Sequence, residues 1–273
     1  MSARELQRVA VRMLHDVSFL EAVYADCEAA LEGLTLTLAE RASLVVPDRR
    51  AWLVDPERPS RVFEAIRKEY PATCALAEIA ERGRDGMLQF FSSPEFHTSV
   101  QKRGTLALAF GGWLNGEALK GRFGRKPTAA MALLETACAR VRRGPGAQVL
   151  SGLLPARLRT SPWLELVLLP EGAFKLFEST RAALEVGRPF RGFRLDGRAS
   201  EWLLIEAPIE GGGLRIGVVP DGLVALLQAA AQGIEAGELV DRAVALGSDP
   251  DEAPGVVEQL YRDALLTEAS SLS

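Results

Sequence analysis

The chain contains two histidines, His15 and His97, which are the first residues to consider for base catalysis or metal binding. Metal-binding histidines on one helix are typically spaced so that both side chains share a face. His97, in the stretch SSPEFHTSVQKRG (92–104), has no second histidine three or four residues away, and His15 falls on a different predicted helix. A site of two histidines and a carboxylate would therefore have no signature in the sequence. We expect His97 to be a helix residue at or near a packing surface, or facing a partner, and not a catalytic base.

Nucleophiles and cofactor loops give no stronger indication of catalysis. Cys27, Cys74 and Cys138 are far apart and form no C-x-x-C, which argues against a disulfide framework or a zinc knuckle. The chain also lacks the G-x-S-x-G of a serine hydrolase. The glycine run at 210–217 misses the G-x-G-x-x-G spacing by one residue and leads into a strand, and DPDE (249–252) lacks calcium-loop spacing. We expect no catalysis by this chain alone, and no metal or cofactor of its own.

Composition and charge are those of a globular protein with an uneven charge distribution. Apolar residues make up 48% of the chain and charged residues 25%. The N-terminus has no signal-peptide apolar core, and the run GTLALAFGGWL (104–114) is too short to cross a bilayer, so we expect a soluble cytoplasmic protein with no membrane partner. The net charge is −4 over residues 1–100, +10 over 101–200 and −10 over 201–273. Such a polarity can steer partners or bring oppositely charged parts together.

Apolar residues recur at helical spacing throughout the first half of the chain. Thr37 and Glu40 have the spacing of a capping box, and Ser93 with Pro94 suits the start of a helix that is interrupted near Gly104. The expected helices include residues 4–16, 17–33, 60–71 (ended by Pro71), 93–114 and 128–143. The first half is therefore predicted to be all-helical.

The second half changes character. The pattern predicts a buried strand at 162–170, a helix at 171–187, and two strands at 201–208 and 214–220 joined as a hairpin. Three helices are expected to follow at 221–233, 236–247 and 251–266. The predicted fold is α+β, with a helical domain over 1–145, a boundary near 142–156, and a winged-helix-like domain of a small antiparallel sheet plus three helices over 150–273.

Paired strands followed by three short helices are the element order of a winged-helix-like module, a type that often binds DNA. Residues 201–273, however, contain three Lys/Arg and 13 Asp/Glu, and phosphate binding requires the opposite charge. An exposed strand edge can instead bind an extended peptide, whose backbone adds a strand to the sheet. The candidate peptide-binding residues are Leu214, Arg215, Ile216 and Val218 on the strand 214–219, and Val257, Leu260 and Tyr261 on the helix 253–266.

The C-terminal stretch LVALLQAAAQGIEAGELVDRAVALGSDPDEAPGVVEQLYRDALL (223–266) resembles the PqqD-like leader-peptide recognition element of ribosomal-peptide modification systems. The N-terminal half is similar to the helical domain of partner proteins of multinuclear non-haem iron oxidases, as in methanobactin and 3-thiaglutamate biosynthesis. The segments that carry this second similarity are FLEAVYADCEAALEGLTLTLAERASL (19–44), DPERPSRVFEAIRKEYP (55–71) and FFSSPEFHTSVQKRGTLALAFGGWL (90–114). Together the two similarities cover most of the chain.

The resemblance implies a heterodimer in which an iron-bearing TIM-barrel oxidase modifies a cysteine or similar residue of a precursor peptide. This chain would be the non-catalytic subunit that binds the leader and docks on the oxidase. The partner interface that it implies comprises Phe91, Phe96, His97 and Trp113. One departure concerns strand order, because a compact recognition element has three contiguous strands, whereas here the strand 162–170 is separated from the hairpin by a helix and a loop.

Three other interpretations remain open. The first is a winged-helix transcriptional or nucleic-acid-binding protein that also uses the basic middle of the chain, whose candidate residues are Lys120, Arg122, Arg125, Lys126, Arg140, Arg142 and Arg143. The second is a non-catalytic helical subunit of an aromatic-ring-opening dioxygenase, to which residues 24–44 are faintly similar, although the strand-rich second half does not fit. The third is an autonomous enzyme, which would have to turn over without a partner.

Overall fold

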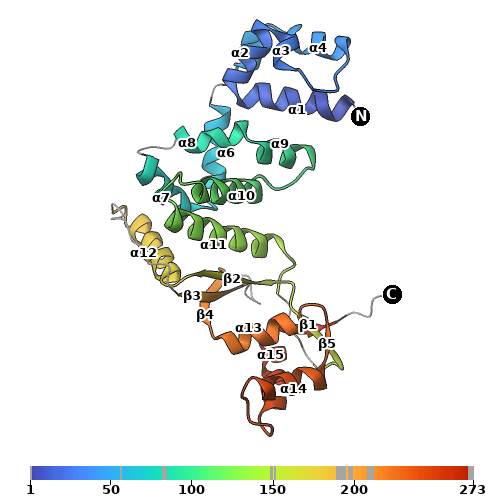
Figure 1. The fold of residues 1–273 in the computed structure, drawn as a ribbon, viewed down its shortest axis with the longest axis vertical. Helices are drawn as coiled ribbons and strands as arrows, with labels where there is room; N and C mark the ends of the chain where they lie inside the picture. The colour runs from blue at the N-terminus through green and yellow to red at the C-terminus, as the bar shows by residue number, and fades with distance from the viewer. Residues whose placement is uncertain are drawn as a thin grey trace. The chain divides into compact units, whose positions relative to one another are not determined.

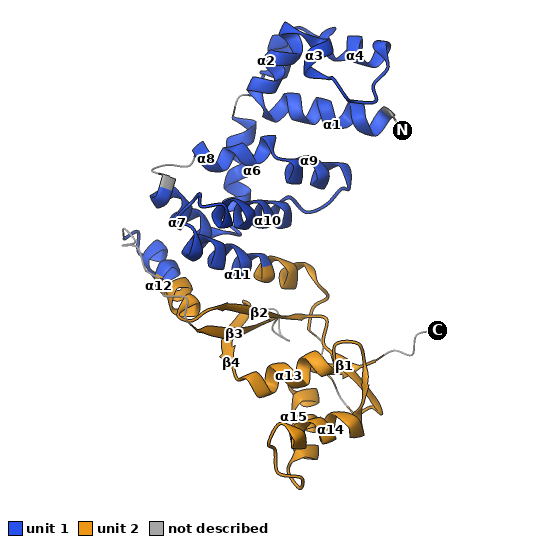
Figure 2. Cartoon of the chain, viewed as in Figure 1, with its two compact units in different colours: residues 1–136, 180–192 blue, residues 137–179, 193–273 orange. Residues whose placement is uncertain are grey.

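A computed structural model describes residues 2–55, 57–81, 85–147, 150, 152–188, 195, 199–207 and 212–269. The fold is mixed α+β, as the sequence predicted, with helices and two small antiparallel sheets (Figure 1). The chain divides into two compact units (Figure 2). Unit 1 comprises Met1–Thr136 and Thr180–Gly192, and unit 2 comprises Ala137–Ser179 and Phe193–Ser273. The functional domains assigned above to 1–145 and 150–273 stay predictions.

The first part of unit 1 is a small group of helices around an aliphatic core. Its helices are α1 (Ser2–His15), α2 (Val17–Ala25), α3 (Cys27–Ala30), α4 (Leu38–Val45) and α5 (Arg49–Trp52). The amphipathic stripe of α1 buries Val9 and Met13 against Leu20 and Leu31. The predicted capping box is present at the start of α4. Thr37 Oγ1 accepts a hydrogen bond from Glu40 N, and the Glu40 carboxylate accepts one from Thr37 N.

The second part of unit 1 surrounds an aromatic core. Its elements are α6 (Arg58–Arg67), α7 (Pro71–Glu81), α8 (Asp85–Leu88), the 3-10 helix η1 (Gln89–Ser92), α9 (Pro94–Gln101), α10 (Leu106–Leu119) and α11 (Lys126–Arg143). Ser93 is the N-cap of α9, accepting a hydrogen bond from Phe96 N at 3.2 Å, with Pro94 in the first turn. The expected break near Gly104 is confirmed, because α9 and α10 are separate helices.

Unit 2 contains two three-stranded antiparallel sheets. The first has the order β2-β3-β4, with β2 (Leu164–Pro170), β3 (Ser200–Glu206) and β4 (Arg215–Val219), so the positions of the predicted strands and the antiparallel pairing of the hairpin are confirmed. The expectation that the first strand is buried was wrong, because within β2, which the structure describes in full, Leu169 is the one buried residue and Leu168 is 49% exposed. Helix α12 (Ala173–Glu185) follows β2, as expected, and residues 208–211 of the predicted hairpin turn lie outside the described residues. The second sheet, β5-β1-β6, was not predicted. Its strands β1 (Arg157–Thr160), β5 (Ile234–Glu235) and β6 (Leu266–Glu268) are only two to four residues long.

Three helices in the C-terminal part of unit 2 confirm the expected succession, with shorter bounds. They are α13 (Asp221–Ala229), α14 (Ala236–Ala245) and α15 (Ala253–Arg262). Their apolar faces meet in one core that includes Leu227, Leu239 and Val257, each fully buried. Residues of β1, β3 and β6 belong to the same core, so these helices pack against strands of both sheets.

Candidate functional site

Strand β4 lies at the edge of its sheet. It pairs with β3 in the register Leu203↔Val218 and Ile205↔Ile216, and within the described part of the chain its other edge has no partner strand. Val218 is 55% exposed, whereas Ile216 is partly buried. The exposed Arg215 forms a cross-strand ion pair with Glu206 at 3.6 Å. The predicted strand residues therefore present a free backbone edge with one apolar and one charged side chain at the surface.

The helix residues predicted to bind peptide are mostly core residues. Val257 is fully buried, and Leu260 and Tyr261 are each 8% exposed, in the same hydrophobic core that Val219 of β4 packs against. Of the three, Tyr261 lines a small cavity of about 110 Å³ together with Leu154 and four other residues of unit 2. The structure thus links β4 to α15 through a common core, and their role in peptide binding stays a prediction.

The four residues predicted at the partner interface meet in one aromatic cluster of unit 1. Phe91, Phe96, His97 and Trp113 are 1–6% exposed. His15 stacks on Phe91 with ring centroids 5.2 Å apart, and both histidines make edge contacts with Phe96, at 5.3 Å for His15 and 5.4 Å for His97. The two histidines are therefore packing residues of a common cluster. A partner would contact the exposed residues around these side chains rather than the side chains themselves.

Burial decides the charge of both histidines. It lowers the pKa of His15 to about 4, with the positive charge of Arg58 acting in the same direction. The pKa of His97 is also lowered to about 4, first by burial and then by Arg12 and Arg8. Both rings are consequently neutral at pH 7. Within the described residues, His15 Nδ1 and both ring nitrogens of His97 are buried without hydrogen-bond partners.

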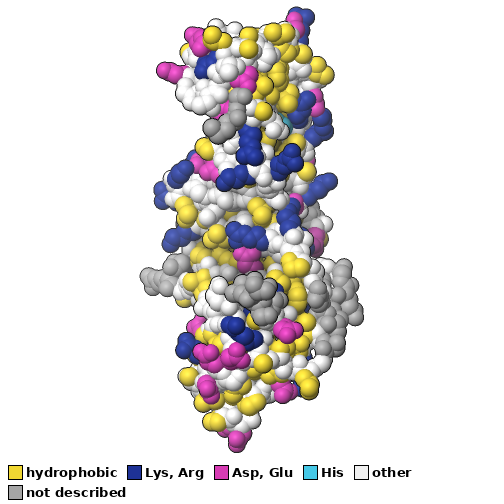
Figure 3. Space-filling view, turned by 90° about the vertical axis from the view of Figure 1, so that its right-hand side faces the viewer, with side chains coloured by type: hydrophobic (Ala, Val, Ile, Leu, Met, Phe, Trp, Pro, Cys, Tyr) yellow, Lys and Arg dark blue, Asp and Glu magenta, His cyan; other side chains and the backbone are white. Residues whose placement is uncertain are grey.

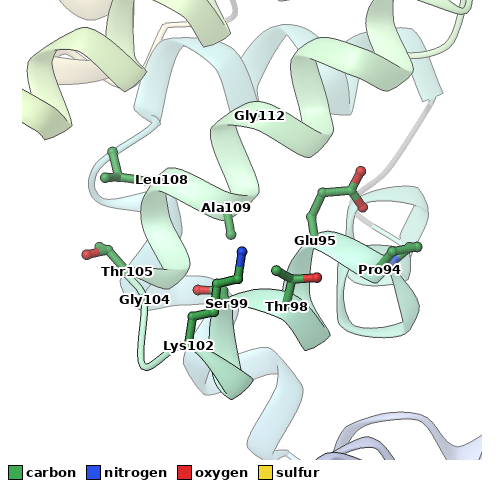
Figure 4. A pocket seen from close by; sticks show the side chains of 10 residues that line it. All are labelled: Pro94, Glu95, Thr98, Ser99, Lys102, Gly104, Thr105, Leu108, Ala109 and Gly112. Carbon is green, nitrogen blue, oxygen red and sulfur yellow. The ribbon is translucent and has the colours of Figure 1, made fainter.

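A groove of about 460 Å³ runs between α9 and α10 of unit 1, beside the buried cluster. Figure 4 shows its lining, with Pro94, Glu95, Thr98, Ser99 and Lys102 contributed by α9 and its end, and Gly104, Thr105, Leu108, Ala109 and Gly112 by the turn and α10. The α10 side of the groove is lined by small residues one helical turn apart, namely the N-cap Thr105 and then Ala109 and Gly112, so little side-chain volume fills the groove there. We call it the helix groove. Sequence reasoning missed it, although this small-residue spacing was visible.

A second, polar hollow of about 520 Å³ adjoins the helix groove at Lys102, which lines both. Its other lining residues are Arg4, Gln7, Val100, Gln101 and Arg103. Within the described residues, Arg4, Lys102 and Arg103 form no ion pair. We call it the basic hollow. On the face seen in Figure 3, dark blue Lys and Arg side chains gather over unit 1.

No group of three or more His, Cys, Asp or Glu side chains within the described ranges could hold a metal ion. Of the helices described, none has the length and apolar character needed to cross a bilayer. No protein-family model matches the sequence, and a search of curated proteins found no match.

Proposed function

We propose that this chain is a non-catalytic partner subunit that binds the leader of a ribosomally made precursor peptide and docks on an iron-dependent oxidase. The observation that carries the proposal is that one edge of β4 in unit 2 pairs with no strand among the described residues. An edge of this kind offers backbone N–H and C=O groups that an extended peptide can satisfy. Val218, beside that edge and 55% exposed, supplies an apolar contact at one register position.

The rest of unit 2 fits a recognition module in this proposal. Strand β4 leads directly into α13, and α13 to α15 pack with β1, β5 and β6, an arrangement that we interpret as winged-helix-like. The three strands β2, β3 and β4 pair consecutively in space although a helix and a loop separate β2 from β3 in the sequence. The departure in strand order noted from the sequence is therefore compatible with a three-stranded recognition sheet.

The proposal assigns the oxidative chemistry to the partner enzyme, whose iron would act on the core of the precursor. This chain would hold the leader so that the residue to be modified stays near the oxidase. The effective concentration of that residue at the oxidase would therefore be raised. Co-expression with the products of neighbouring genes, followed by size-exclusion chromatography and metal analysis, tests the assembly. Co-elution with an iron-containing protein is the expected result. The proposal would be overturned if this chain eluted alone and bound no peptide encoded by a neighbouring gene.

Backbone pairing at β4 can be tested separately from the assembly. Two leader peptides can be compared, one with N-methyl groups on its odd residues and one with N-methyl groups on its even residues. One of them should lose binding and the other should keep it, because only alternate N–H groups of an added strand face the sheet. The substitution Val218→Glu should weaken binding. Leu246→Glu is the matched control, because Leu246 is 43% exposed in the same unit and lies at the end of α14. Strand addition would be contradicted if the two substitutions changed peptide affinity equally, or if both N-methylated peptides bound equally well.

Duplex DNA binding is the alternative, and the charges of residues 201–273 oppose it. Of the three arginines in residues 201–273, Arg215 pairs with Glu206 and Arg262 with Glu258. Among described residues this leaves Arg242 as the one arginine of the segment without an ion pair. We expect no electrophoretic shift of duplex DNA at low salt. A shift whose affinity fell steeply with added salt would favour the alternative.

A further inference from the structure

The helix groove of unit 1 is open and apolar along most of its length. Leu108 and Ala109 of α10 form its apolar wall, and Gly112 continues that wall without a side chain. A Cβ atom built on Gly112 would meet no other atom within 4 Å, so the space beside this glycine is empty. A wall of small residues allows the backbone of a bound helix to approach closely.

A buried hydroxyl group lies in the same groove. Ser99 is 8% exposed, and within the described residues its Oγ has no hydrogen-bond partner. Ser99 lines the groove beside Gly104, at which an added Cβ would lie 3.1 Å from Ser99 Oγ. An unpaired buried hydroxyl costs free energy unless it finds a partner. A carboxylate or backbone carbonyl that displaced the side chains covering this Oγ would accept its hydrogen bond.

Charge distinguishes the two ends of the groove. Lys102 lies at the end of α9, where the basic hollow begins, and its amine points across the groove towards Ala109 (Figure 4). Arg4 and Arg103 add two further cations without ion pairs among the described residues. Glu95, at the opposite end of α9, is the acidic residue of the lining. An occupant with apolar side chains and a carboxylate-rich end would complement this arrangement.

One of these cations occupies a position that favours glycine. Arg103 has a φ of 52°, and the bonds Gly104 N to Ser99 O and Arg103 N to Val100 O form a Schellman motif. Glycine adopts this left-handed conformation without the steric cost that arginine bears. Replacing Arg103 by glycine therefore removes a cation while relieving the helix end. This makes a binding variant that does not depend on unfolding.

We propose that the helix groove and the basic hollow together bind an acidic, amphipathic segment of another protein. Its apolar side chains would lie along α10 in the groove, and its carboxylates would pair with Lys102, Arg103 and Arg4. The open groove and its continuation into a second hollow suit a peptide segment better than a small enclosed ligand. The site lies in unit 1 and is independent of the leader-binding role proposed for β4 in unit 2.

An unbiased peptide selection tests this proposal. Displayed random peptides of about twelve residues, long enough for roughly three helical turns, are selected on the full-length chain. The expected result is enrichment of acidic sequences with apolar residues three or four positions apart. Synthetic enriched peptides are then measured by fluorescence anisotropy. Gly112→Leu, which fills the groove, and Lys102→Glu should each weaken binding by about tenfold or more, and Arg103→Gly should weaken it while the chain keeps or gains thermal stability.

Matched controls come from the same unit. Gly116→Leu places the same side chain on α10 at another glycine with open space around it, outside the groove lining. Lys68→Glu reverses the charge of an exposed residue at the C-terminal end of α6. Both should leave affinity within about twofold. Enrichment that persists on the Gly112→Leu chain, or enriched peptides without acidic residues, would overturn the proposal. Binding of sodium decanoate that is lost in Gly112→Leu, with no peptide enriched, would instead assign the site to a small amphipathic anion and also overturn it.

Discussion

Glu135 is a buried carboxylate that fixes the start of a neighbouring helix. It is 2% exposed on α11, and its two oxygens accept hydrogen bonds from Ala72 N at 3.0 Å, Thr73 N at 2.9 Å and Thr73 Oγ1 at 2.6 Å. These donors lie in the first turn of α7, where backbone N–H groups have no partner within the helix and favour a negative charge. Glu135, 62 residues along the chain from Thr73, thus caps the N-terminus of α7.

Removing this carboxylate should destabilise unit 1. Glu135→Ala leaves three buried donors unsatisfied, and we expect a loss of about 2–4 kcal/mol in the free energy of unfolding. Glu135→Gln keeps one acceptor oxygen and should lie between the wild type and Glu135→Ala. Urea unfolding followed by circular dichroism measures the effect, with the exposed Glu171→Ala as control. A Glu135→Ala chain as stable as the control would contradict the capping role.

The two buried histidines should make unit 1 sensitive to acid. Their pKa values of about 4 in the folded chain lie below the ordinary value of 6.5, so the folded state binds fewer protons than the unfolded state. Their contribution to stability is complete above about pH 6.5 and is lost as the pH falls towards about 4. Burial raises the pKa of the neighbouring Asp16, but hydrogen bonds from Phe19, Ser92 and Arg12 outweigh it and hold this pKa below its ordinary value of 3.8. The stability that Asp16 contributes is therefore present above its ordinary pKa and is lost as the pH falls below it.

Apolar replacements should flatten this pH dependence. In the double variant His15→Phe, His97→Leu, the urea midpoint should change less between about pH 7 and pH 4.5 than in the wild type. The charged neighbours Asp55 and Arg58 of His15, and Arg8, Arg12 and Asp16 of His97, are unchanged in this variant. An equal slope in both chains would show that other groups dominate the acid response.

At the scale of elements, adjacent glycines on α10 should respond oppositely to alanine. A Cβ on Gly111 would clash with Thr136 Oγ1 and lie 2.5 Å from the Tyr70 hydroxyl oxygen, whereas Gly112 faces open space. Gly111→Ala should cost about 1–3 kcal/mol by overpacking. Gly112→Ala should stabilise the chain by up to about 1 kcal/mol, because alanine favours the helix. Thermal unfolding of the two variants measures both signs, and stabilisation by Gly111→Ala would show that α10 does not pack tightly here.

Elements were predictable from the sequence where local chemistry decides them. The capping box of Thr37 with Glu40, and the Ser93 N-cap followed by Pro94, act within one helical turn and were predicted correctly. The strands β1, β5 and β6 were missed because their pairing joins distant residues, such as Arg157 with Glu235 and Leu158 with Glu268. Two to four residues carry too little alternation to indicate a strand.

The candidate sites divide in the same way. A strand over 214–220 was predicted from the sequence, but the place of β4 at a sheet edge depends on how the strands pair. The helix groove depends on how α9 and α10 pack after the turn at Gly104, which is a tertiary property. The burial of His97 beside His15 likewise arises from the packing of α1 with α9 around Phe96. No spacing within either helix indicates that contact.

For the whole molecule, the uneven charge predicts that the two proposed peptide-binding surfaces have opposite charge preferences. Residues 201–273 carry a net charge of −10, which would favour a leader with basic residues at β4 or an interaction with the chain's own basic middle. The basic hollow in unit 1 would favour acidic segments. Because each preference is electrostatic, both affinities should fall with added salt.

A charge-reversal series separates these contributions. Replacing lysines and arginines of the leader by glutamates should weaken its binding to the full chain, and Val218→Glu should add to that loss. The acidic peptides selected on the full-length chain should respond to Lys102→Glu and be indifferent to Val218→Glu, because the two residues belong to different units. Isothermal titration of both peptide classes against both variants completes the comparison. Unchanged affinity across the leader series would mean that the acidic segment does not select the leader, and its charge would then be matched within the chain itself or by the partner enzyme.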